Sequence, residues 1–87
     1  MHYVVTYDIH SDRRRRRVLN ALKNYGLPVQ FSVVECELDM RRLEDMEADI
    51  KALINPRTDN VRIYQLCENC FFRAEVFGTH KLSAQKL

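Results

Sequence analysis

The spacing of hydrophobic residues alternates between two periods along this chain, which limits the folds open to it. Apolar residues in short runs or at every second position are typical of strands, and a spacing near 3.6 is typical of helices. In order, the pattern predicts a strand over 2–9, a helix over 12–25, a strand over 29–38, a helix over 40–54, and strands over 61–66 and 73–77. This order favours an α/β chain of the α+β kind, a two-layer sandwich with both helices on one face of the sheet.

Both predicted helices have recognisable ends. Ser11 or Asp12 can cap the first helix and Asp39 the second, because short polar side chains accept hydrogen bonds from the free N–H groups of the first turn. Residues that end helices follow each stretch: Gly26 and Pro28 after the first, Asn55 and Pro56 after the second.

The predicted strand over 29–38 is apolar on both faces. Val29, Phe31 and Val33 lie on one face, and the other face carries Val34, Cys36 and Leu38. A strand that is apolar on both sides is covered on both sides, yet the two helices can cover only one face of the sheet. We therefore expect a second copy of the chain on the other face, which makes the protein a homodimer.

Length and composition are those of one ordinary globular domain, with 87 residues, 46% hydrophobic, and a net charge of +2. The charge is uneven, because residues 11–25 hold six basic and one acidic side chain whereas residues 35–51 hold three basic and seven acidic ones. No signal peptide or membrane span is recognisable. Three cysteines, an odd number without an export signal, favour reduced thiols and a cytoplasmic protein without membrane partners.

Asp8 is the first candidate for chemistry. It ends the apolar run that begins at Val4, and a carboxylate at the tip of a buried strand needs a cation, a donor or water beside it. The five arginines from Arg13 to Arg17 follow closely, and their guanidinium groups suit phosphate oxygens. A carboxylate that can hold a metal beside a polyanion-binding cluster suggests phosphodiester chemistry on nucleic acid. The alternative is a solvated Asp8 that caps a loop or pairs with an arginine.

The five arginines cannot all face one ligand, because helical residues advance about 100° each. Extending the apolar stripe of Val18 and Leu22 backwards places Arg14 or Arg15 on the core side, where it needs a carboxylate partner. Arg13, Arg16 and Arg17 are then the candidates for binding a DNA or RNA backbone. The alternative is a basic helix start that pairs with the acidic second helix.

Segments along the chain, taken in order, resemble the Cas-two family of small CRISPR-associated proteins. The matching segments are Val4 to Ile9 with the arginine run, Tyr25-Gly26, residues 29–38, Arg62 to Cys67 with Cys70, and Val76-Phe77-Gly78. The resemblance implies a ferredoxin-like βαββαβ domain over 1–78, which requires a tight break near Gln30–Ser32. The tail over 79–87 could remain free or pair as an extra strand with the other protomer.

The resemblance also implies a function. Family members are described as Mg²⁺- or Mn²⁺-dependent endonucleases (endoribonucleases or DNases), with Asp8 of each protomer meeting across the dimer axis around the metal ion. They act with the Cas-one integrase when new spacers are acquired. Asp8 is thereby assigned both as catalytic residue and as metal ligand.

Three functions stay open: a metal-dependent nuclease, a non-catalytic dimeric adaptor that holds DNA for the integrase, and a free-standing toxin-like ribonuclease. His10 is either a proton shuttle beside Asp8 or a surface histidine. Cys67 and Cys70 have the spacing of zinc ligands, but no second pair completes a four-ligand site. We therefore expect reduced, half-buried thiols there.

Overall fold

The computed structural model describes residues 1–78, and these form four strands and three helices. The elements in chain order are β1 His2–Asp8, α1 Asp12–Leu22, β2 Gly26–Gln30, β3 Val33–Glu37, α2 Met40–Leu53, β4 Asn60–Leu66 and α3 Glu68–Phe72. The tail over 79–87, which was expected either to remain free or to pair with the other protomer, lies outside the described residues.

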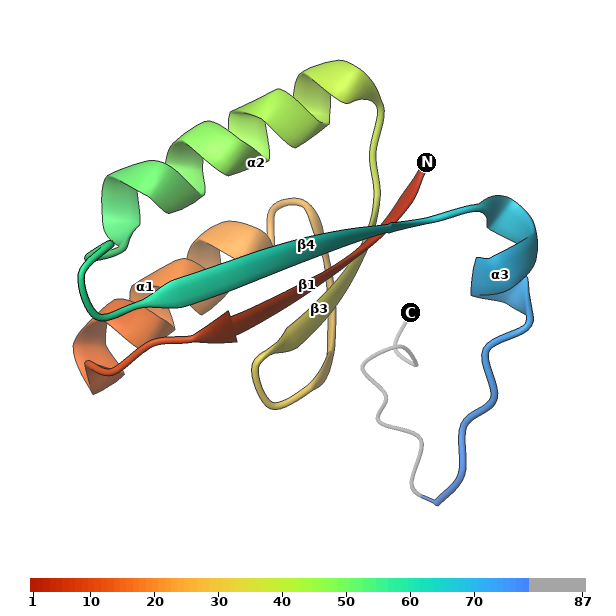
Figure 1. The fold of residues 1–87 in the computed structure, drawn as a ribbon, viewed down its shortest axis with the longest axis horizontal. Coiled ribbons are helices and arrows are strands. Elements are labelled where there is room, and N and C mark those ends of the chain that lie inside the picture. The colour runs from red at the N-terminus through yellow and green to blue at the C-terminus, as the bar shows by residue number, and fades with distance from the viewer. Residues whose placement is uncertain (79–87) are drawn as a thin grey trace.

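The strands form one antiparallel sheet in the order β2-β3-β1-β4. With two helices as crossovers, this is the ferredoxin-like arrangement, and the predicted two-layer sandwich is confirmed (Figure 1). β1 is central, with Val5 opposite Val34 of β3 and Ile63 of β4. β1 pairs with β4 from His2 to Asp8 and with β3 from His2 to Thr6, so its last residues have a ladder partner on one side only.

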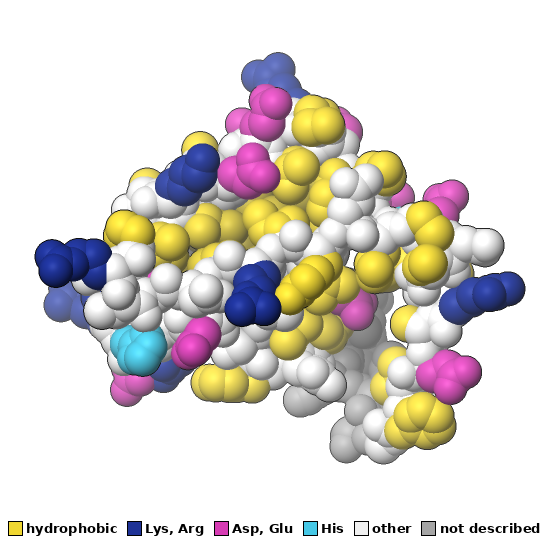
Figure 2. All heavy atoms as spheres, viewed as in Figure 1, with side chains coloured by type: hydrophobic (Ala, Val, Ile, Leu, Met, Phe, Trp, Pro, Cys, Tyr) yellow, Lys and Arg dark blue, Asp and Glu magenta, His cyan; other side chains and the backbone are white. Residues whose placement is uncertain are grey.

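The core lies between the sheet and the helices α1 and α2. Alternate residues of β1 and β3 and the apolar stripes of the two helices supply it: Tyr3, Val5, Tyr7, Val34 and Cys36 from the sheet, and Val18, Leu22, Met46 and Ile50 from the helices. A band of hydrophobic side chains is visible between α2 and β4 (Figure 2). The opposite face of the sheet carries no helix from α1 or α2, so its side chains are available for a site.

Helix α1 starts as predicted and ends earlier. Ser11 is its cap, and the Ser11 hydroxyl accepts a hydrogen bond from the backbone N–H of Arg14 at 3.2 Å. The helix stops at Leu22 instead of residue 25, and Gly26 begins β2. A Cβ on Gly26 would lie 2.2 Å from the carbonyl oxygen of Glu35, so this glycine is needed for the close approach of β2 to β3.

The predicted single strand over 29–38 is wrong. It contains the end of β2, a turn at Phe31 and Ser32, and all of β3, which confirms the break that the resemblance requires. Ser32 adopts a positive φ of 66°, and its carbonyl oxygen accepts a hydrogen bond from the N–H of Tyr7 at 3.1 Å. The turn contains no glycine or proline. Its hydrogen bond to β1 stabilises the positive φ at Ser32 in place of a glycine.

The predicted strand over 73–77 is also wrong, since residues 74–77 have no regular structure. The connection before it is helix α3, whose residue Phe71 stacks on the buried ring of His2 with centroids 4.0 Å apart. Within the described chain, no strand pairs with 73–77, and an extended segment without a ladder partner leaves its backbone groups to water. No helix among the described residues is long and apolar enough to cross a membrane.

Candidate functional site

Asp8 lies on the open face of the sheet, at the last position of β1. Side chains alternate along a strand, so Val5 and Tyr7 point to the core while Thr6 and Asp8 point away from it. Asp8 is exposed although Tyr7 and Ile9 beside it are buried. The alternation that buries β1 therefore also presents this carboxylate to solvent.

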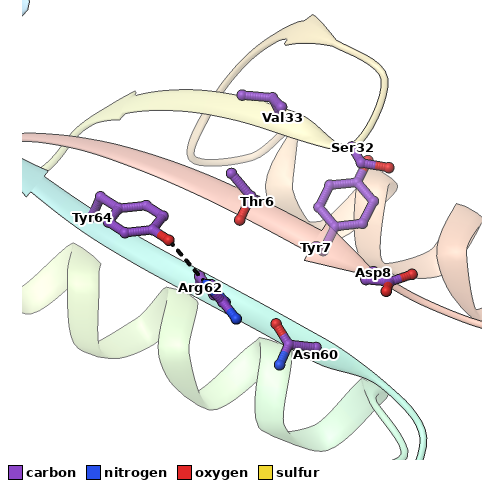
Figure 3. A pocket seen from close by; sticks show the side chains of 8 residues that line it. All are labelled: Thr6, Tyr7, Asp8, Ser32, Val33, Asn60, Arg62 and Tyr64. Carbon is purple, nitrogen blue, oxygen red and sulfur yellow. Dashed lines mark hydrogen bonds between the residues drawn. The ribbon is translucent and has the colours of Figure 1, made fainter.

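A depression in the open face brings Asp8 together with polar groups from β4 and from the turn before β3 (Figure 3). Its lining residues are Thr6, Tyr7, Asp8, Ser32, Val33, Asn60, Arg62 and Tyr64. Asn60 is the register partner of Asp8 in β4. Burial raises the pKa of the Tyr7 phenol, so Tyr7 stays protonated at neutral pH.

The Asp8 carboxylate makes no hydrogen bond and no ion pair with the residues from 1 to 78. The capping role that was its alternative belongs to Ser11, and the arginine pairing is not seen within this part of the chain. Asp8 is thus an exposed carboxylate whose oxygens are available to a cation or to solvent.

A different aspartate, Asp59, forms the ion pair with an arginine, which is Arg14. Arg14 donates two hydrogen bonds to the Asp59 carboxylate, from Nε to Oδ2 at 2.7 Å and from Nη2 to Oδ1 at 3.1 Å. The backbone N–H groups of His10 and Asn55 donate to the same carboxylate at 3.2 and 2.9 Å, and the Thr58 hydroxyl at 3.2 Å. These donors, Arg14 above all, hold the pKa of Asp59 far below its usual range.

Arg14 or Arg15 was predicted to need a carboxylate partner, and the Asp59 contacts confirm this for Arg14. Sequence reasoning did not identify Asp59 as that partner, because 45 residues separate the two and no spacing relates them. Asp59 also joins the loop after β1 to the start of β4, so it supports the end of the sheet where Asp8 lies.

The other four arginines of the run in α1 divide into two groups. Arg15 hydrogen bonds to the carbonyl oxygen of Ile9 at 3.2 Å, pairs with Asp12, and lies over the exposed ring of Phe31. The side chains of the remaining three, Arg13, Arg16 and Arg17, are exposed and make no hydrogen bond or ion pair within residues 1–78. These are the three that the helical geometry left for phosphate.

Arg62 is a basic residue that the sequence interpretation missed. It is exposed on β4, lines the same depression as Asp8, and donates to the Tyr64 hydroxyl at 3.4 Å. The alternation of apolar residues in the sequence could have identified it, because Val61 and Ile63 face the core and Arg62 between them faces the open side of the sheet.

The remaining candidates lie outside this depression. His10 is exposed, and only its backbone N–H makes a contact, to Asp59. Cys67 and Cys70 are exposed rather than half-buried as expected. No group of three or more His, Cys, Asp or Glu side chains suited to a metal ion occurs within residues 1–78.

Known proteins resemble this chain along most of its length. The family model described as CRISPR associated protein Cas2 matches residues 1–74. A Thermus thermophilus protein named CRISPR-associated endonuclease Cas2 2 is 48% identical over 80 residues, which cover 92% of this chain and 84% of the relative. A Chloroflexus aurantiacus protein named CRISPR-associated endoribonuclease Cas2 3 is 38% identical over 78 residues, covering 90% and 84%.

Solved structures agree with the sequence relatives. The crystal structure of Streptococcus pyogenes Cas2 superposes with a TM-score of 0.81 at 32% identity, covering 90% of this chain and 100% of that one. A crystal structure of a hypothetical Thermus thermophilus protein gives a TM-score of 0.83 at 42% identity, covering 93% and 94%. With the strand order, the strand-end Asp8 and the arginine-rich α1 already described, these matches show that the chain belongs to the CRISPR-associated Cas2 family.

Proposed function

We propose that this protein is a metal-dependent endonuclease that cleaves phosphodiester bonds during CRISPR adaptation. The observation that carries the proposal is Asp8, an exposed carboxylate without a partner in residues 1–78, on a sheet end that also presents Arg62. The names of the relatives, endonuclease and endoribonuclease, support the reaction class.

The residues present fit a hard divalent cation only in part. Mg²⁺ takes one or two carboxylates and keeps several waters, and one chain offers Asp8 with the side-chain oxygens of Ser32 and Asn60 in the same depression. A second carboxylate would come from Asp8 of the other protomer. The cation would neutralise charge on the scissile phosphate and lower the pKa of a bound water.

The open sheet face supports the homodimer that this site requires. It presents apolar surface without a cover from α1 or α2, including Leu27 and Tyr64, which are 46% and 48% exposed. Two such faces brought together would remove this apolar area from water. They would also bring both copies of the Asp8 depression to one interface.

Nucleic acid is proposed to bind through its backbone. Arg13, Arg16 and Arg17 on α1 and Arg62 on β4 supply exposed guanidinium groups, which bind phosphate without reading sequence. Helix α2 presents the exposed carboxylates Glu44, Asp45 and Asp49 and would repel phosphate. DNA and RNA backbones both satisfy this chemistry.

A second function is favoured by the same arginines. A dimer that holds duplex DNA for the Cas-one integrase needs the basic surface and no metal, and one carboxylate per chain is a sparse metal site. Both functions place the protein in the cytoplasm, where DNA and reduced thiols coexist. They differ in whether Asp8 is required.

The deciding experiment compares Asp8→Asn with Asp45→Asn, the same chemical change at an exposed position of α2. RNA and DNA cleavage is measured with Mg²⁺, with Mn²⁺ and with chelator, alongside spacer acquisition in cells that carry the integrase. The nuclease proposal expects Asp8→Asn alone to lose cleavage. Loss of cleavage with unchanged spacer acquisition would favour the adaptor, and unchanged metal-dependent cleavage would contradict the Asp8 site.

A further inference from the structure

Cys67 and Cys70 form a thiol pair that the proposed nuclease site does not use. Cys67 directly follows β4 and Cys70 lies in α3, at the start of the segment that leaves the sheet (Figure 1). Both side chains are exposed and reduced. Two thiols separated by two residues in a cytosolic α/β protein are typical of redox pairs as well as of metal sites.

The local geometry distinguishes the two thiols. The Cys67 sulfur accepts a hydrogen bond from the backbone N–H of Cys70 at 3.3 Å, and the Cys67 carbonyl oxygen accepts one from Phe71 at 3.0 Å. The first turn of α3 therefore folds the Cys70 residue back over the Cys67 sulfur. The disulfide of a C-x-x-C pair is compatible with such a helical turn, as redox proteins with this motif show.

We propose that Cys67 and Cys70 form a redox-active dithiol that exchanges with low-molecular-weight disulfides, with Cys67 as the attacking thiol and Cys70 as the resolving thiol. The two roles follow from the geometry, since the Cys67 sulfur accepts a hydrogen bond from the backbone N–H of Cys70, whereas the Cys70 sulfur accepts none within residues 1–78.

The titration behaviour supports this division. The backbone N–H and the thiol of Cys70 donate to Cys67 and lower the pKa of the Cys67 thiol, and the same interaction raises the pKa of Cys70. The thiolate is the nucleophile in exchange. Below both pKa values, each unit by which the pKa of one thiol is lower raises its thiolate fraction about tenfold.

The reaction balances as two exchanges. The Cys67 thiolate attacks a small disulfide, a protein–small-molecule S–S bond forms, and one small thiolate leaves. The Cys70 thiol then loses its proton to solvent and attacks the Cys67 sulfur, which releases the second small thiol. Overall two protein thiols are oxidised to one disulfide, and one small disulfide is reduced to two thiols.

The chain contains its own control in Cys36. Its side chain is buried in the core, and burial raises the pKa of its thiol to about 11. Cys36 should therefore stay reduced and unmodified in the folded protein while the surface pair reacts. Modification of Cys36 in the same sample reports unfolding.

The first test equilibrates the full chain with glutathione and glutathione disulfide, followed by acid quench, alkylation and peptide mass spectrometry. We expect a Cys67–Cys70 disulfide within one chain, which dithiothreitol reverses, with Cys36 reduced. A pair that stays reduced in the oxidising buffer, or that forms only links between chains, would overturn the proposal. So would stoichiometric zinc bound through Cys67 and Cys70 in the purified protein, because the pair would then be a metal site.

The second test separates the two roles. Cys70→Ser should trap glutathione on Cys67 as a stable mixed disulfide, whereas Cys67→Ser should react with glutathione disulfide more slowly, in line with the smaller thiolate fraction of Cys70. The pH profile of iodoacetamide alkylation should have a lower midpoint for Cys67 than for Cys70. Equal rates and equal midpoints in the two variants would contradict the assigned roles.

Discussion

Asp8 and Asp59 lie at the same end of the sheet and have opposite surroundings. Asp8 is opposite Asn60, and Asp59 directly precedes Asn60. The Asp59 side chain is fully buried, and two donor groups of Arg14, the N–H groups of His10 and Asn55 and the Thr58 hydroxyl bind it. Asp8 is exposed and has no such partner in residues 1–78. The surroundings, and not the residue type, make one aspartate structural and leave the other free for chemistry.

The same contrast divides the arginine run. Arg14 binds Asp59 and is part of the fold, while the side chain of Arg13, one position earlier, is exposed and makes no hydrogen bond or ion pair in the described chain. Neighbours on a helix point about 100° apart, so adjacent identical residues serve different purposes. The effect of a substitution at Asp59 can therefore be compared with the effect of the same substitution at Asp8, which has different surroundings.

The largest effect is expected from Asp59→Asn. Removal of the charge leaves Arg14 without a carboxylate, and the amide that replaces it brings N–H donors toward existing donors. Thermal unfolding followed by circular dichroism should show a larger fall in melting temperature than any substitution of Asp8 or of the exposed arginines. Asp8→Asn, the identical chemical change, should leave the melting temperature close to that of the wild type. Equal melting temperatures for the two variants would remove the distinction between the aspartates.

Acid should reproduce the Asp59 effect without a mutation. The pKa of Asp59 is lower in the folded protein than its ordinary value of 3.8, so its contribution to stability is complete above that value and is lost as the pH falls through the folded pKa. Chemical unfolding between pH 6 and pH 2 should show a steep loss of stability below about pH 4. Asp59→Asn should flatten this dependence, and Asp8→Asn should retain it. An unchanged slope in Asp59→Asn would assign the acid sensitivity to other carboxylates.

A smaller effect is expected from the exposed arginines. Replacement of Arg13, Arg16 and Arg17 by alanine should reduce the log–log salt slope of duplex DNA binding by about 0.9 for each phosphate that is no longer neutralised. Stability should change by no more than about 0.5 kcal/mol for each substitution, because exposed side chains outside the packed core contribute little. Arg41→Ala on the acidic helix α2 is the control. If both variants give the wild-type slope, the binding surface lies elsewhere.

The smallest effect concerns Asp8 in the absence of metal. If two Asp8 carboxylates meet in a dimer, Asp8→Asn removes their repulsion and should stabilise the metal-free dimer slightly, because exposed charge pairs contribute little to stability. Sedimentation and unfolding of the same preparation, with metal removed, measure both the dimer and its stability. A less stable variant would indicate that Asp8 has a structural acceptor role like that of Asp59.

Much of the fold followed from local patterns in the sequence. The extents of β1, α2 and β4 were predicted to within a few residues, and Ser11 and Asp39 cap the helices as expected. These elements have strong periodicity and short polar caps, which act through nearest neighbours. The turn at Phe31–Ser32 and helix α3 were missed from residue patterns alone, because each depends on interactions with β1, which is distant in sequence.

For the candidate site, the sequence by itself determined that Asp8 ends a buried strand and that only some of the five arginines can be free. Strand alternation and the helical repeat are properties of the local backbone, so they can be read without a fold. Tertiary structure alone decided that Asp59 is the partner of Arg14 and that Arg62 shares the depression with Asp8. Strand pairing and chain crossovers bring together residues about fifty positions apart, and no local rule encodes such distances.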